Sequence, residues 1–315
     1  MTRHGRRQHI VPQQMIKRFA NDEGKLLGLH KPTLSIGTRM RSPRGILFRD
    51  YYYDDSVKSF DEEVLIPVER KFSRYYAQIA DAPWEDKVWP GEVGAAFVDW
   101  VAAQFCRTAL LVEMNKVMFA QKGGIAAEAY ARASQLADNL VRAGQFQQYQ
   151  DLLSRPLWHW KCCIFPGDDE CNLVITDNPV CQALGLGKGG RVLLVPLSKK
   201  RVLFGGKSEV LEKCRGFSAH EVNFCLVAWS ERDIYAADRR TLEFVVADLR
   251  GEGVIAGPSE LLEAARKPLF GLPERSAANP IPNGVDTDMF WHEFANSFGP
   301  AIADGDARGT TEPIS

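Results

Sequence analysis

The stretch Asn172-Leu-Val-Ile-Thr-Asp-Asn-Pro-Val180 joins a short apolar run to a group of polar residues. The three apolar residues after Asn172 predict a short buried strand. Pro179 is expected to end that strand, because proline has no backbone N–H to donate to a sheet. Asp177 and Asn178 then stand at the strand end. Strand ends often present carboxylates and amides at sites, so this stretch is the first candidate functional site.

Segments before residue 150 favour helices, and segments after it favour strands. Apolar residues recur at helical spacing over 60–79, 92–120 and 125–149. Short runs rich in β-branched and aromatic residues predict strands at 157–165, 191–197, 201–204 and 233–237, with 172–180 as a hairpin partner of 157–165. We therefore predict an α+β fold, in which a helical N-terminal half packs on a mostly antiparallel sheet from the C-terminal half. Such closely spaced strands disfavour a parallel, doubly wound sheet.

The same patterns predict one globular domain over residues 1–298. It is helix-rich over 1–150 and strand-rich over 151–250, and 255–298 is expected to be a helical C-terminal segment. Residues 299–315 are small, polar and without periodicity, and they predict a disordered tail.

The composition is that of a soluble globular protein, with 45% hydrophobic and 25% charged residues among 315. No apolar run has the length of a membrane span. The N-terminus shows no secretory signal, and the cysteine count of 7 is odd. These features predict reduced thiols and a cytoplasmic protein.

Positive charge is concentrated at the N-terminus. Residues 1–50 contain 11 Lys/Arg and 3 Asp/Glu, a net charge of +8, whereas the remainder nets −9. Clusters such as Arg39, Arg41 and Arg44 predict contact with the phosphates of a nucleic acid or nucleotide. The alternative, which the mixed composition favours, is a solvated basic face that balances the acidic remainder.

Two further stretches contain polar candidates. Pro12 suits the first turn of a helix, with His9 and Gln13 on either side of it. His9 is either a capping residue or a member of a polar site. Gln104 and Arg107 lie in the apolar helix expected over 92–120.

A buried guanidinium needs a carboxylate partner, because a broken buried pair costs roughly 3–5 kcal/mol. Asp177 and Glu69 are the candidate partners of Arg107. The resulting ion pair is equally well explained as part of a site or as a structural salt bridge.

Several strong motifs are missing from the sequence. It has no Cys-x-x-Cys pair for zinc, no Gly-x-Ser-x-Gly elbow, no His-Glu-x-x-His and no dinucleotide fingerprint after a strand. The sequence therefore dictates no reaction class.

Four stretches together resemble a bacterial family, domain of unknown function 4238. They are His9-Ile-Val-Pro-Gln13, Glu69 in its helix, Gln104-Phe-Cys-Arg-Thr108 and Thr176-Asp-Asn-Pro179. The resemblance covers about residues 8–240 in the right order. It differs from the family pattern at Gln14, where an aromatic residue is common, and at Thr176, where serine is common. It implies no established activity, so it supports the choice of site residues rather than a reaction.

The positions that carry the resemblance are mostly polar, and we expect them to meet in one pocket. Catalytic candidates are His9, Glu69, Arg107 and Asp177, and substrate-binding candidates are Gln13, Gln104 and Asn178. The two acids could hold a divalent metal, the candidate cofactor, or act as acid and base. Arg107 could bind a phosphate, and His9 could transfer a proton.

Two functional hypotheses follow from this set. The first is a hydrolase of nucleic acid or nucleotide phosphodiesters, for example a defence or toxin enzyme. The second is a non-catalytic binding or scaffold protein whose polar residues form a buried structural network. Neither the substrate nor the oligomeric state follows from the sequence.

Overall fold

The structure is a computed structural model. It describes residues 7–50, 64–81, 91–106, 146–147, 150–151, 153–154, 159–164, 171–183, 192–206, 208–213 and 217–252. Arg107, most of the helix expected over 125–149, the expected helical segment 255–298 and the expected tail 299–315 lie outside these residues. The side chain of His9 also lies outside them.

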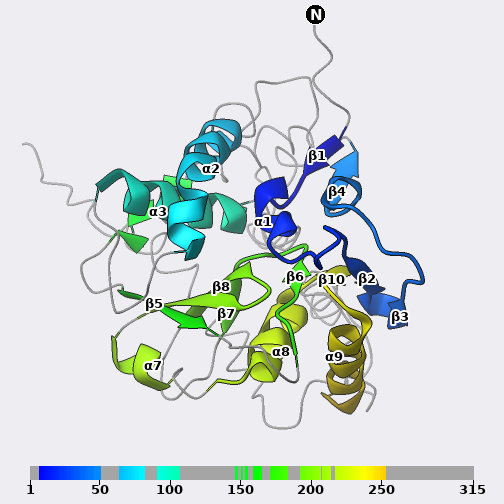
Figure 1. Ribbon diagram of the computed structural model, residues 1–315. Coiled ribbons are helices and arrows are strands. Elements are labelled where there is room, and N and C mark those ends of the chain that lie inside the picture. Colours follow the sequence, from blue (N-terminus) through cyan, green and yellow to red (C-terminus); the bar gives the residue numbers. More distant parts are fainter. Residues whose placement is uncertain are drawn as a thin grey trace, which may run out of the picture.

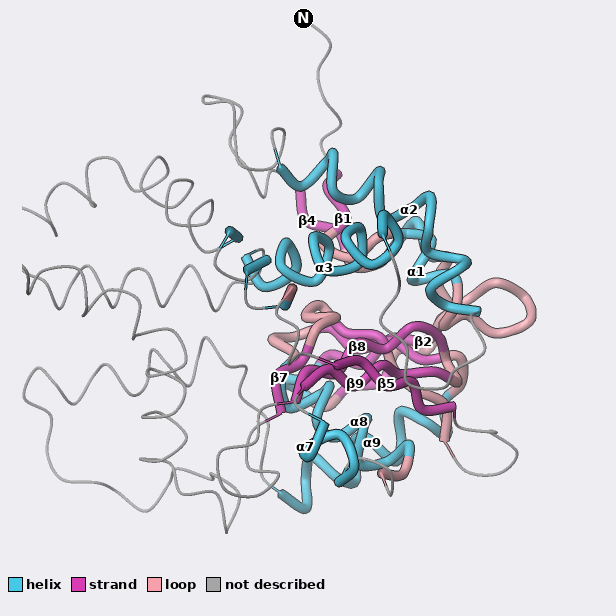
Figure 2. The backbone as a smooth tube through the Cα atoms, turned by 90° about the vertical axis from the view of Figure 1, so that its left-hand side faces the viewer, coloured by secondary structure: helices cyan, strands magenta, loops and turns pink. Residues whose placement is uncertain are grey.

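Strands form a central layer with helices on both of its faces (Figure 2). One face is covered by α1 (Gln13–Lys17), α2 (Ile66–Asp81) and α3 (Gly91–Cys106). The opposite face is covered by α7 (Ser208–Lys213), α8 (Ala219–Trp229) and α9 (Arg239–Glu252). The α+β class is confirmed, and the structure adds a second helical layer from within the strand-rich part of the chain.

Two four-stranded sheets make up the central layer (Figure 1). The first has the order β3 (Ser35–Ile36), β2 (Leu27–His30), β10 (Asp233–Ala236) and β6 (Ile175–Thr176). The second has the order β5 (His159–Ile164), β9 (Arg201–Gly206), β8 (Val192–Ser198) and β7 (Cys181–Ala183). Strands β1 (Arg7–His9) and β4 (Phe48–Asp50) form a separate ribbon, and η1 (Lys31–Thr33) and η2 (Pro43–Gly45) are short 3-10 turns. Every strand pair in the described residues is antiparallel.

The pairing of the 172–180 stretch differs from the expected hairpin. Strand β5 pairs with β9, whereas β6 pairs with β10 in the other sheet, with Ile234 opposite Thr176. Four residues, 177–180, therefore connect the two sheets. The expectation was wrong because nearness in sequence was taken to decide the partner, and β10, about sixty residues later, provides the edge on which β6 pairs.

Aromatic packing joins the helical layer to the sheet. Phe72 of α2 stacks on Trp100 of α3, with ring centroids 4.3 Å apart. Phe97 of α3 meets the edge of Trp160 on β5 at 4.8 Å. The indole of Trp160 lies directly over Gly205 of β9, where any Cβ atom would overlap the ring. Glycine at this position lets the indole lie flat on the sheet and reach α3.

Helix α8 begins with the capping box that its sequence predicts. The Ser218 hydroxyl accepts a hydrogen bond from the Glu221 N–H at 3.2 Å, and the Glu221 carboxylate accepts one from the Ser218 N–H at 2.7 Å. These bonds satisfy N–H groups that a helix start otherwise leaves unpaired. They also lower the pKa of Glu221 below its ordinary value of 4.5.

Removing this cap is expected to lower stability in a pH-dependent way. Ser218→Ala should cost about 1 kcal/mol at neutral pH. Because the folded pKa of Glu221 is depressed, its contribution is complete above about pH 4.5 and is lost as pH falls through the folded pKa. Glu221→Gln should therefore flatten the pH dependence of unfolding below about pH 4.5. Urea titrations of both variants from neutral to acidic pH test this. An unchanged pH profile for Glu221→Gln would contradict it.

No helix in the described part of the chain combines the length and the apolar character needed to cross a membrane.

Candidate functional site

The carboxylate of Asp177 is buried and surrounded by backbone donors. It follows directly after β6, and 6% of the residue is exposed. The N–H groups of Glu231, Arg232 and Asp233 donate to its two oxygens at 2.9, 2.8 and 3.2 Å. Its own N–H donates to the Asp233 carbonyl at 3.1 Å. Asp177 therefore fixes the corner at residues 228–233, where α8 ends and β10 begins.

Burial and hydrogen bonding act in opposite directions on the pKa of Asp177. Burial penalises the charged form and raises the pKa, and the three backbone N–H groups oppose that rise. Burial dominates, so the pKa lies above the ordinary value of 3.8. The positive ends of three backbone dipoles point at the carboxylate, which is an environment that suits an anion and disfavours a neighbouring cation.

Asn178 makes a second connection to the same corner. Its Nδ2 group donates to the Trp229 carbonyl at 2.8 Å, and 3% of the residue is exposed. The Thr176 hydroxyl donates to the Asn178 carbonyl at 2.8 Å, which closes the turn locally. The amide of Asn178 thus binds the carbonyl of the last residue of α8, one of the carbonyls that a helix end leaves without internal partners.

Lys31 lies on the other side of this corner, and the sequence pattern did not single it out. It is fully buried, and its Nζ donates to the carbonyls of Ser230 at 2.8 Å and Ala228 at 3.2 Å. A cation at the carbonyl end of a helix is favourable, because it complements the negative end of the helix dipole. The corner at 228–233 is therefore held between a cation at the end of α8 and the anion Asp177 at the amides that follow.

The remainder of the 172–180 stretch is bonded along α8. Asn223, buried within that helix, accepts from the Val174 N–H at 3.0 Å and donates to the Asn172 carbonyl at 2.8 Å. This pairing also explains why the strand β6 is shorter than the apolar run. Leu173 and Val174 are buried, but Val174 bonds to a side chain of α8 rather than to a neighbouring strand. Asn223 was not among the candidates, since a single asparagine within a helix gives no signal of such a role.

Gln104 belongs to a second group on the opposite helical layer. It is 2% exposed, and in the amide orientation that satisfies both ends it donates to the Ile10 carbonyl at 3.2 Å and accepts from the Trp100 indole at 3.1 Å. Ile10 follows His9, and the Ile10 N–H donates to the Leu47 carbonyl at 2.9 Å. Gln104 therefore holds the segment between β1 and α1 against α3.

The remaining candidates lie around this second group. His9 ends β1, opposite Phe48 of β4. Gln13 is the first residue of α1, and Glu69 lies in the first turn of α2, both half-buried. Arg107 comes immediately after the described part of α3. The hydrogen bonds thus form two separate groups. Asp177 and Asn178 bind the corner at 228–233, whereas Gln104 binds the segment from His9 to Gln13.

The described histidine, cysteine and acidic side chains bear on metal binding and on thiol chemistry. No group of three or more histidine, cysteine or acidic side chains there is arranged to hold a metal ion. Six cysteines in this part of the chain are free thiols. Burial raises the pKa of Cys225 to about 11 and that of Cys162 to about 12, so both remain protonated and weakly nucleophilic at neutral pH.

Comparison with known families gives one match. The family model described as protein of unknown function, DUF4238, matches residues 7–240. The chain belongs to the DUF4238 family. No curated protein and no solved structure matches the chain. The matched range contains both hydrogen-bonded groups and ends at the start of α9, so the DUF4238 region includes both helical layers and both sheets.

Proposed function

We propose that this member of the DUF4238 family is a non-catalytic binding protein, and that the polar residues of its motifs form a buried network that holds the fold together. The observation that carries the proposal is the environment of Asp177. Both of its oxygens accept backbone N–H groups, and the residue is 6% exposed. A general acid, a general base or a metal ligand needs a lone pair that its substrate or ion can reach. Three of the roughly four acceptor positions of this carboxylate bind backbone N–H groups, and the residue is almost fully buried.

The other buried amides support the same proposal. Asn178 and Gln104 are almost fully buried, and their side chains bond to main-chain or indole groups. A polar network whose members are all satisfied specifies one arrangement of the core, because any other arrangement leaves a buried group unpaired. That requirement would preserve polar motifs in a protein without catalytic activity.

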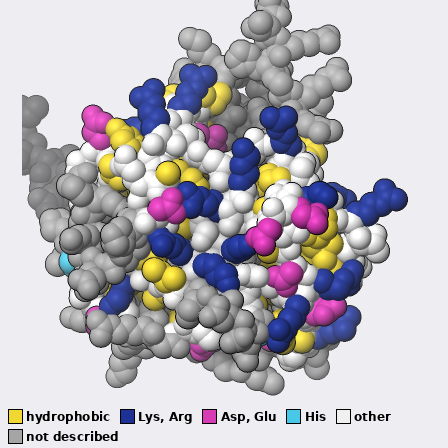
Figure 3. Space-filling model, in the orientation of Figure 1, with side chains coloured by type: hydrophobic (Ala, Val, Ile, Leu, Met, Phe, Trp, Pro, Cys, Tyr) yellow, Lys and Arg dark blue, Asp and Glu magenta, His cyan; other side chains and the backbone are white. Residues whose placement is uncertain are grey.

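The surface favours a partner with negative charge. Arg39, Arg41 and Arg44 are exposed in the loops before β4. The face in Figure 3 has Lys and Arg side chains over much of its area, with Asp and Glu side chains between them. A nucleic acid or nucleotide is one candidate partner through these arginines. The free thiols of the described residues agree with a reducing compartment, for which we propose the cytoplasm.

A second candidate function is a phosphodiester hydrolase centred on the other group of residues. The observation that favours it is the bond from Gln104 to the Ile10 carbonyl, which holds the neighbour of His9 against α3. Arg107 follows Gln104 by one helical turn in sequence, and Glu69 lies on α2, which packs on α3. In this hydrolase His9 would transfer the proton, and a divalent metal on Glu69 is a candidate cofactor.

One experiment separates the two functions. The purified protein is incubated with labelled DNA, RNA and nucleotides, in Mg²⁺, Mn²⁺ or EDTA, beside His9→Ala, Arg107→Ala and Asp177→Ala. We expect no turnover from any sample and a large loss of thermal stability in Asp177→Ala only. Metal-dependent cleavage that disappears in a folded His9→Ala or Arg107→Ala protein would establish the hydrolase and overturn the binding proposal.

A further inference from the structure

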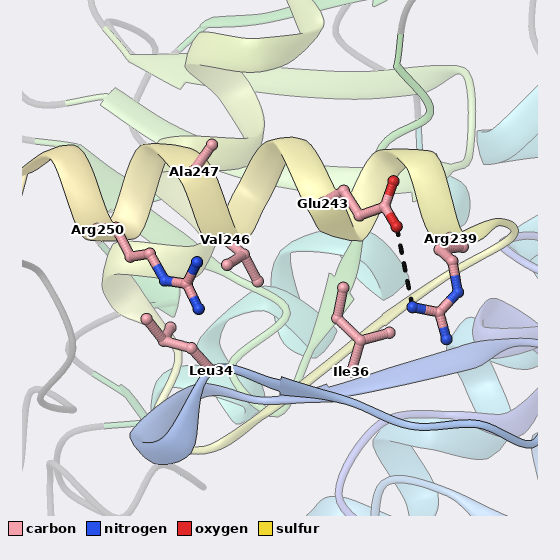
Figure 4. Close-up of a pocket in the computed structure, with 7 residues that line it drawn as sticks. All are labelled: Leu34, Ile36, Arg239, Glu243, Val246, Ala247 and Arg250. Atoms are coloured by element: carbon pink, nitrogen blue, oxygen red, sulfur yellow. Dashed lines mark ion pairs between the residues drawn. The ribbon is translucent and has the colours of Figure 1, made fainter.

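A hollow of about 440 Å³ lies between α9 and β3, the edge strand of the first sheet (Figure 4). Its floor is apolar, and its charged side chains all come from α9. The lining residues are Leu34, Ile36, Arg239, Glu243, Val246, Ala247 and Arg250. The hollow is therefore an amphipathic surface, with apolar side chains from the strand segment facing a helix that contributes two arginines to the lining.

The two arginines lie at opposite ends of the hollow. Arg239 and Arg250 are about three helical turns apart, or about 16 Å along the axis. Arg239 is more than half exposed, forms an ion pair with Glu243 at 3.8 Å and donates a hydrogen bond to the Gly37 carbonyl at 3.3 Å. Arg250 is exposed, and within the described residues no carboxylate lies in ion-pair distance of it. The hollow thus has an excess of positive charge, at least one unit of which is available to a ligand.

We propose that this hollow binds an extended acidic peptide of a partner protein, with a carboxylate at each end and apolar side chains between. An extended chain rises about 3.3 Å per residue, so about five residues span the distance between the arginines. The apolar floor is formed by Leu34, Ile36 and Val246. It favours a peptide with apolar side chains over a phosphate backbone, because charged phosphates against an apolar surface lose hydration without gaining a partner. The Arg250 guanidinium can bind a carboxylate through two hydrogen bonds, and Arg239 can bind a second carboxylate beside its bond to the Gly37 carbonyl. This inference rests on the proposed binding function and names its partner class.

The test uses the full-length protein and a fluorescein-labelled peptide with the sequence glutamate-serine-leucine-serine-valine-serine-glutamate, whose acidic and apolar side chains all point to one face of an extended chain. Fluorescence anisotropy is expected to give a dissociation constant of about 10–100 µM at low salt, which is typical of a small charged interface. Arg250→Glu should weaken binding at least about tenfold, since it replaces an attraction with a repulsion. Raising the salt concentration should weaken binding to the wild type as well.

The matched control is Arg240→Glu, which makes the same charge change on the same helix. Arg240 lies outside the lining and packs over the Phe244 ring at 5.5 Å. We expect this variant to bind the peptide like the wild type. Equal weakening by both variants would overturn the proposal, because binding would then depend only on net charge.

Three further outcomes would also overturn it. The first is no binding up to about 1 mM peptide. The second is displacement of the labelled peptide by a short single-stranded oligonucleotide at a lower concentration than by unlabelled peptide. The third is a change of sedimentation coefficient in Arg250→Glu, which would assign this face to contact between two copies of the chain. None of these outcomes involves Asp177, so they leave the proposed buried network to its own test.

Discussion

Asp177→Ala is expected to lower the free energy of unfolding by about 4 kcal/mol, the largest effect of any single change considered for this protein. The substitution leaves the N–H groups of Glu231, Arg232 and Asp233 without their acceptors. Each buried N–H left unpaired costs roughly 1–3 kcal/mol. Urea unfolding followed by circular dichroism measures the change. A drop in melting temperature of about 10 °C should accompany it.

The control for this variant is Asp22→Ala. Asp22 is fully exposed, and its ion pair with Lys199 spans 3.5 Å. Exposed pairs of this kind contribute about 0–1 kcal/mol, so the variant should unfold almost like the wild type. If Asp177→Ala were equally mild, the carboxylate would be dispensable for the corner at 228–233, and the proposal of a structural network would fail.

Lys31→Met should lower the free energy of unfolding by about 3 kcal/mol. Methionine retains most of the volume of the buried stem, so the loss comes from the ammonium group, which donates to the Ser230 and Ala228 carbonyls. Hydrogen bonds from charged donors contribute roughly 1.5–3 kcal/mol each, and the carbonyls that they leave are buried. The same urea titration measures this effect.

Lys25→Met is the matched control for Lys31→Met. Lys25 is half exposed and pairs with Glu23 at 3.1 Å on the surface. Its loss is expected to change stability by less than about 0.5 kcal/mol. A stable Lys31→Met protein would mean that the end of α8 needs no buried cation.

Combining the two core changes tests whether they act on one structural unit. Asp177 and Lys31 hold the same corner from its two sides, so the loss of either should already loosen it. The double variant is therefore expected to be destabilised by less than the sum of the two single variants. If the two losses of stability simply add, Asp177 and Lys31 act independently and do not hold one structural unit.

The sequence predicted the elements with local signals. Ser218 and Glu221 have the spacing of a capping box, and α8 starts where that box places it. The helix expected over 60–79 is α2, which begins at Ile66, next to Pro67, rather than at residue 60. The pattern over 242–246 fits a strand or a short helix, and these residues lie within α9. Local chemistry decides such boundaries, because caps and prolines act within one turn.

The partners of the candidate residues were not predictable in the same way. Asp177 was identified from its place after a strand. Its partners are three backbone N–H groups, and because almost every residue has such a group, the sequence does not mark them. Lys31 gave no signal, since lysine is among the residues least often buried. The pairing of β6 with β10 was missed for a related reason: both are short, and their pairing depends on how the chain returns after α8. Residue type indicates that a polar group needs partners, and the fold decides which ones.

The aromatic contacts described above also provide an optical reporter of tertiary order. An unbroken series of aromatic rings runs from α2 to β5 through Phe72, Trp100, Phe97 and Trp160. Rings held in fixed, asymmetric surroundings give near-ultraviolet circular dichroism, which disappears when packing loosens even if helices persist. Separation of the helical layer from the sheet should therefore be visible as a loss of near-ultraviolet ellipticity before the far-ultraviolet signal changes. The chain thus contains a probe of its own layered architecture that needs no label.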